Sequence, residues 1–164
     1  MTLKFSDLAP AELHYAISAL QVEYADLLDD DRLEDWPELF TEACIYQVIA
    51  RENADRGLGV AAIFCTSRAM LVDRVVSLRR ANIYPLRHHR HILSTARIIS
   101  VADDLVRAQT SYLVLQTRAD GATGIYNAGK YLDDIVFVDG RLRFSRKIAI
   151  FDTNRVDTLM VTPI

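Results

Sequence analysis

The sequence predicts an α+β fold, with N-terminal helices packed on a long, curved, mostly antiparallel sheet. Helical periodicity is concentrated before Arg87, and three or four long β-type runs separated by turn signals follow that residue. Helices first and a meander of strands last is the pattern of helices segregated to one side of a sheet. The 164 residues, 51% of them hydrophobic, suit one domain over 1–164.

The first helix is predicted from Pro10 to Asp29, where apolar residues recur at steps of three and four. The members of this stripe are Leu13, Ile17, Leu20, Tyr24 and Leu27. A short second helix is expected within 31–40, because Pro37 suits a first helical turn, and it should end near Phe40.

The next elements alternate between types. Residues 43–50 are rich in β-branched and aromatic side chains and predict a strand, whereas residues 52–59 have the composition of a loop. Ser67 is a suitable N-cap for a third helix, which should run to about Arg80.

The C-terminal half predicts long strands. Asp139-Gly140 is the strongest hairpin signal. Over 105–117 one face is expected to point inward, with Val106, Ala108, Thr110, Tyr112 and Val114. Leu113 and Leu115 make the second face apolar as well, so we expect a helix layer or a partner subunit to cover them.

Composition excludes several classes of function. The net charge is −3 with no basic block, so a nucleic-acid partner is not expected. The N-terminus lacks the features of a signal peptide and no apolar run reaches the length of a membrane span, so we expect a cytoplasmic protein without a membrane partner. Cys44 and Cys65 have no zinc-ligand spacing, and we expect two buried free thiols.

The stretch HHRH, residues 88–91, holds three of the four histidines and allows three interpretations. On a strand, His89 and His91 share one face and His88 lies on the other. A metal site would need a third ligand, for which Asp133, Asp134 and Asp152 are the available carboxylates.

The second interpretation is an acid/base pocket inside the fold, for which the candidates are His91, Tyr46, Tyr131 and Asp152. Each tyrosine could equally be a core residue with a satisfied hydroxyl. The third interpretation is a subunit interface, because arginine and partly exposed histidine are common there. Its candidate residues in this segment are Tyr84, Arg87, His88, His89, Arg90 and His91.

Arg146 is a further interface candidate. Regular alternation places it between Phe144 and Ile148 on an apolar face, where a charge would need a partner such as Asp152. A β-bulge that turns Arg146 outward would remove that need.

Several segments, taken in order, resemble one family. They are DRLEDWPELFTEACIYQVIARENADRGL, MLVDRVVSLR, RHIL and LRFSRKIAIFDTNRVDTLMVTPI. They are similar to the small (beta) subunit of the terminal oxygenase of aromatic-ring-hydroxylating dioxygenases. The branch serving terephthalate and salicylate is the most similar, through YQVIARENADRGL, ANIYPLRHHRHIL and DTLMVTPI. The resemblance implies a cone-shaped fold shared with nuclear transport factor 2, scytalone dehydratase and ketosteroid isomerase.

The resemblance also implies a partner. In that family a large alpha subunit carries the Rieske [2Fe-2S] cluster and the mononuclear non-haem iron, commonly in a hexamer of three alpha and three beta chains. NADH supplies electrons through a reductase or ferredoxin. We therefore expect a non-catalytic structural subunit with no catalytic, cofactor-binding or metal-binding residue. A free-standing isomerase or dehydratase and a small-molecule binding protein of the same fold are the alternatives.

Overall fold

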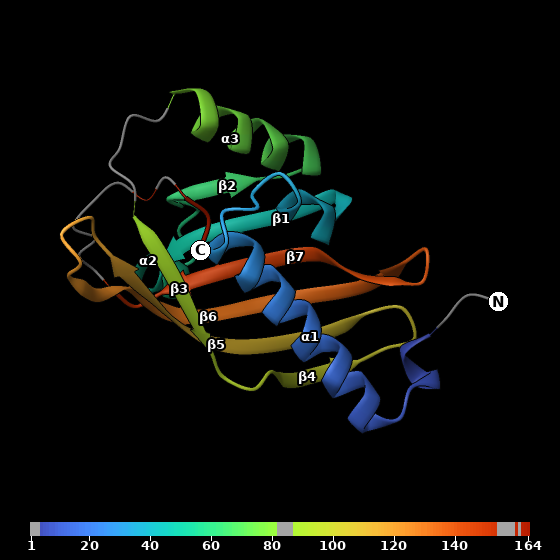
Figure 1. The fold of residues 1–164 in the computed structure, drawn as a ribbon. Coiled ribbons are helices and arrows are strands. Elements are labelled where there is room, and N and C mark those ends of the chain that lie inside the picture. Colours follow the sequence, from blue (N-terminus) through green and yellow to red (C-terminus); the bar gives the residue numbers. More distant parts are fainter. Residues whose placement is uncertain (1–3, 82–86, 154–159, 161) are drawn as a thin grey trace.

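The computed structural model describes residues 4–81, 87–153, 160 and 162–164 (Figure 1). Helices and strands follow one another along the chain as η1 (Phe5–Asp7), α1 (Pro10–Asp29), η2 (Trp36–Leu39), β1 (Phe40–Ala50), α2 (Arg51–Asp55), β2 (Ile63–Cys65), α3 (Arg68–Ala81), β3 (His88–Leu93), β4 (Arg97–Val101), β5 (Val106–Thr117), β6 (Thr123–Val138) and β7 (Arg141–Phe151). The α+β prediction is confirmed.

The strands form one curved sheet in the order β2-β1-β7-β6-β5-β3, with β4 pairing beside β3 on β5. Among the described pairs, β1 and β7 run parallel and the others antiparallel. Helix α1 crosses one face of this sheet (Figure 1). We call this the inner face and the opposite one the outer face.

Helix α1 has the bounds that its periodicity predicts. Its stripe residues are all buried in the main core. The Glu12 carboxylate accepts a hydrogen bond from the Ala9 backbone N–H at 2.9 Å, which satisfies a donor at the start of the helix. The apolar stripe therefore fixes which side of α1 meets the inner face.

Strand β5 and the β6–β7 hairpin also agree with the sequence. Val106, Tyr112 and Val114 are among the buried inward residues of β5. Asp139 and Gly140 have φ of 50° and 75°, the left-handed pair that a two-residue type I′ turn requires. Cys44 and Cys65 are buried free thiols, as expected.

Two segments differ from the expectation. Residues 52–59 are not wholly loop, because α2 forms one helical turn whose Ala54 packs against a small cluster of Ile49, Ile148 and Ile150. The run that begins at Arg90 breaks into β3 and β4, both paired with β5. A turn that packs on three isoleucines gains burial that loop composition does not reveal.

Strand β7 is not regular at Arg146. A register shift places Ile135 opposite Phe144 and Asp134 opposite Arg146, so Ser145 is the extra residue of a β-bulge. Arg146 consequently turns to the outer face, 3.7 Å from an Asp134 oxygen, and Asp152 instead pairs with Arg51 at 2.8 Å. The prediction from regular alternation is therefore wrong, and the alternative, a β-bulge that turns Arg146 outward, is confirmed.

Candidate functional site

Strand β3, which carries the histidines, pairs antiparallel with the C-terminal half of β5, residues 112–117. His89 and His91 lie opposite Gln116 and Val114 on the inner face, while His88 and Arg90 lie opposite Thr117 and Leu115 on the outer face. Tyr84 is outside the described residues. The predicted split of HHRH into a pair and a single is thus present.

His91 joins β3 to the end of α1. Its Nδ1 lies 2.6 Å from Asp29 Oδ1, and its backbone N–H donates to Asp29 Oδ2 at 2.7 Å. Both side chains are nearly inaccessible, at 1% and 2% exposure, and Arg90 lies 3.7 Å from the same carboxylate. Asp29 and His91 therefore connect the end of α1 to β3 through buried hydrogen bonds.

His89 ends a directed chain of hydrogen bonds. Arg87 donates to Gln116 Oε1 at 2.9 Å, which turns the amide nitrogen of Gln116 toward His89 Nε2, also at 2.9 Å. Burial lowers the pKa of His89 to about 4, and the neighbouring His91 adds to this effect. His89 is thus neutral near pH 7 and accepts a hydrogen bond.

The outer face beside β3 exposes apolar side chains, which we call the outer apolar patch. It consists of Ile92, Leu113, Leu115 and Ile125. Register places Ile92 opposite Leu113 and Leu115 opposite Ile125, so the four side chains are neighbours. Ile92 and Ile125 are 52% and 69% exposed. Such contiguous exposed apolar groups usually mark an interaction site.

The four acid/base candidates do not all lie in the same environment. Tyr46, Tyr131 and His91 are buried on the inner face, whereas Asp152 is exposed and paired with Arg51. Burial raises the pKa of Tyr46 to about 12 and that of Tyr131 well above its usual value. The four predicted residues therefore do not form one constellation.

A buried ion pair that sequence reasoning missed lies inside the fold. Lys147 and Asp133 face each other across β6 and β7, with Nζ 3.2 Å from Oδ1 and both side chains at 0% exposure. Gln21 of α1 accepts a hydrogen bond from Lys147 at 3.0 Å and donates one to Asp133. Only the bulge turns Lys147 inward, and the consecutive pairs Asp133-Asp134 and Arg146-Lys147 were the available signal.

Metal-binding donors are not assembled in the part of the chain that the structure describes, since no three His, Cys, Asp or Glu side chains gather there. A Rieske cluster needs thiolates and imidazoles together. Cys44 lies on β1 and Cys65 on β2, and burial raises the pKa of Cys44 to about 11, which favours the thiol. The residues present do not fit an iron–sulfur cluster. No helix in the described ranges is long and apolar enough to cross a membrane.

Solved structures share the fold. A beta subunit assigned to an aromatic-ring-hydroxylating dioxygenase of Novosphingobium aromaticivorans DSM 12444 superposes with a TM-score of 0.85 at 48% identity, covering 92% of this chain and 96% of that one. The beta subunit of benzoate 1,2-dioxygenase from Burkholderia mallei gives a TM-score of 0.71 at 16% identity, over 94% of each chain. The cone-shaped fold implied by the resemblance is confirmed.

Sequence comparisons agree. The anthranilate 1,2-dioxygenase small subunit of Burkholderia cepacia is 47% identical over 92% of this chain and 93% of its own. The beta 2 subunit of the terephthalate 1,2-dioxygenase terminal oxygenase component of Comamonas sp is 38% identical over 90% and 96%. Residues 23–158 match the sequence model of the ring hydroxylating beta subunit family. The chain therefore belongs to the beta-subunit family of the aromatic-ring-hydroxylating dioxygenases.

Proposed function

We propose that this beta subunit is a non-catalytic structural subunit, which supports the assembly of catalytic alpha subunits through the outer apolar patch. Family membership supports the partnership, since its relatives are described as small subunits or as components of a terminal oxygenase. The observation that carries the proposal is the exposure of Ile92 and Ile125 beside Leu113 and Leu115. A second chain that covers this face would remove apolar surface from water.

The polar border of the patch supports the same role. His88 and Arg90 start from the outer face of β3, and the Arg90 side chain is 60% exposed although its guanidinium lies 3.7 Å from Asp29. An apolar centre with arginine at its edge is a common composition of protein interfaces. We assign a supporting role to Arg87, His89 and His91, because their contacts hold β3 against β5 and α1.

The proposed complex contains three alpha and three beta chains. The alpha subunit holds the Rieske cluster and the mononuclear iron, and NADH supplies electrons through a reductase or ferredoxin. This division agrees with the donor set of this chain, in which the described residues offer no three-ligand cluster. A cytoplasmic location follows from the proposed electron source.

The proposed substrate is an aromatic carboxylate. Two relatives are named for anthranilate and terephthalate, which both carry a carboxylate on the ring. Anthranilate joins terephthalate and salicylate as a substrate to test. Turnover of each by the purified alpha–beta complex would rank them, and failure of all three would exclude these three compounds as substrates.

The assembly proposal is tested by charge introduced into the patch. Replacing Ile92 and Ile125 together by aspartate should leave the isolated chain folded, because both side chains are exposed. Co-expressed with the alpha subunit, the double variant should form at least tenfold less complex in sedimentation velocity, since two buried carboxylates would lack partners.

The matched control is the pair Tyr15→Asp and Val22→Asp on α1, whose side chains are 77% and 53% exposed but lie away from the patch. The control should assemble as the unmodified chain does. Equal assembly of both double variants would remove the patch from the interface, and an unmodified chain that never joins the alpha subunit would refute the assembly role itself.

A further inference from the structure

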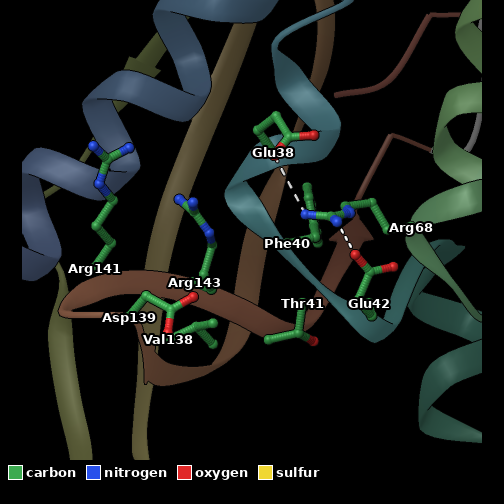
Figure 2. A pocket seen from close by; sticks show the side chains of 9 residues that line it. All are labelled: Glu38, Phe40, Thr41, Glu42, Arg68, Val138, Asp139, Arg141 and Arg143. Atoms are coloured by element: carbon green, nitrogen blue, oxygen red, sulfur yellow. Dashed lines mark hydrogen bonds and ion pairs between the residues drawn. The ribbon is translucent and has the colours of Figure 1, made fainter.

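A pocket of about 610 Å³ opens where β1 separates from β7 (Figure 2). Phe40 pairs with Phe144, and the next pair along the strands is Ile45 with Arg146. Between these pairs the chain advances five residues in β1 and only two in β7. β1 therefore has three more residues than β7 between these two pairs, an irregularity in the register. The pocket is lined by residues at this irregularity, by Arg68 and by residues of the β6–β7 hairpin.

Three carboxylates and three guanidiniums line the pocket, and one guanidinium already contacts two of the carboxylates. Arg68, at the start of α3, donates to Glu38 at 3.3 Å and also contacts the Glu42 carboxylate (Figure 2). Thr41 contributes a hydroxyl that donates to the backbone oxygen of Ala43. These acidic groups are therefore engaged with Arg68 and not with the opposite wall.

Two arginines on the opposite wall have no such partner. Arg141 and Arg143 stand at alternate positions of β7, so their side chains leave the same face of the strand and extend the same way (Figure 2). Within the described chain, neither guanidinium has an ion pair or a side-chain hydrogen bond. Asp139 in the hairpin turn is the remaining carboxylate of the lining, so this wall carries a charge of +1, and the opposite side, with two glutamates and Arg68, carries −1.

We propose that this pocket binds a small monocarboxylate through Arg141 and Arg143. The planar fork of a guanidinium matches a carboxylate, with two parallel N–H donors for its two oxygens. The lining as a whole is formally neutral, and only the wall that bears Arg141 and Arg143 has one positive charge in excess. This suits a monoanion better than a phosphate dianion, which the carboxylates of the lining would oppose. Val138 gives the rim an apolar surface for a small hydrocarbon group, and the volume lies in the range of small-molecule sites.

The test uses the full chain alone and two ring compounds of matched shape. Calorimetric titration with benzoate should give a Kd of about 1 mM or tighter, whereas benzamide, which lacks the charge, should bind at least tenfold more weakly. Replacing Arg141 and Arg143 together by glutamine should weaken benzoate binding at least tenfold. The control pair is Arg97→Gln and Arg118→Gln, two exposed arginines away from the pocket, and it should leave benzoate binding unchanged.

A second readout protects the test from a folding artefact. The arginine side-chain N–H signals of Arg141 and Arg143 should shift on benzoate addition in the unmodified chain, while those of Arg97 should not. Benzamide binding equal to benzoate binding, or benzoate binding retained in the double variant of the pocket, would overturn the proposal. Because the isolated chain is used, either result is independent of the assembly role proposed above.

Discussion

Two ion pairs at consecutive positions of β6 and β7 face opposite sides of the same sheet. Asp133 and Lys147 meet on the inner face, and Asp134 and Arg146 meet on the outer face. The inner pair is at 0% exposure, whereas Arg146 is 44% exposed. The chemical groups are similar, so the comparison isolates the effect of environment.

The inner pair is embedded among aromatic rings. Lys147 Nζ lies 3.9 Å from the Tyr131 ring centroid and 4.3 Å from those of Tyr24 and Phe144. Burial lowers the pKa of Lys147 to about 8 and raises the pKa of Asp133, and their mutual attraction opposes both shifts. The outer pair is only partly buried, with its arginine side chain 44% and its aspartate side chain 19% exposed. Removing one inner partner therefore leaves the other charge buried without a counter-charge. Removing one outer partner leaves a charge that water can still reach.

The largest effect is expected at Lys147. Lys147→Met should lower the free energy of unfolding by about 3–5 kcal/mol, because it leaves the Asp133 carboxylate buried without its cation. Denaturant titration of the isolated chain measures this. The double change Lys147→Met with Asp133→Leu should recover much of the loss. A single variant within 1 kcal/mol of the parent would show that water reaches Asp133.

The next effect concerns how closely β6 and β7 approach. A Cβ added at Gly129 would lie 2.1 Å from the Ile150 backbone oxygen, so Gly129→Ala should cost up to about 3 kcal/mol as the strands move apart. Gly124 on the same strand has no heavy atom within 4 Å of an added Cβ. Gly124→Ala is therefore the control. Thermal unfolding that is identical for the two variants would contradict the close approach.

A smaller effect is expected from pH at His89. Its pKa is about 4 in the folded chain and near 6.5 when unfolded, so the unfolded state takes up a proton first as the pH falls. Stability should therefore decline between pH 6.5 and 4, by about 1–2 kcal/mol after allowance for partial exposure. Urea titrations across this range should show a shallower decline for His89→Gln than for the exposed His88→Gln. Parallel profiles would refute the contribution.

The smallest effect is expected in the outer pair. Asp134→Asn should change the free energy of unfolding by less than about 1 kcal/mol, although Asp134 contacts both Arg107 and Arg146. The change should shrink further in 1 M salt, which screens exposed charges. A loss as large as that of Lys147→Met would erase the contrast between the two faces.

Local patterns in the sequence predicted the elements whose cause is local. The stripe of α1 gave its bounds, and Asp139-Gly140 gave the β6–β7 hairpin. Leu113 and Leu115 predict that β5 is apolar on its second face as well. Ile92 and Ile125 were missed as members of it, because register between distant strands brings them together.

Features that depend on irregular pairing were predicted poorly. A bulge that turns Arg146 outward was only an alternative to regular alternation, and its effect of turning Lys147 inward was missed. The register irregularity of β1 beside the arginine pocket left no signal in the sequence. Asp29 and His91 are separated by 62 positions, so no spacing rule joins them. The interface roles of Arg87, His88, His89, Arg90, His91, Leu113, Leu115 and Arg146 stay predictions.

The parallel pairing of β1 with β7 also bears on how the chain reaches its fold. It joins Phe40 to Phe144 and Ala50 to Phe151, segments about a hundred residues apart, inside the sheet and next to the edge strand β2. Loop closure of that length must precede the contacts it allows, which slows folding. During synthesis, the apolar side of α1 and the aromatic residues of β1 must wait for β7 to emerge. The nascent chain is therefore most prone to aggregation just before its last strand appears.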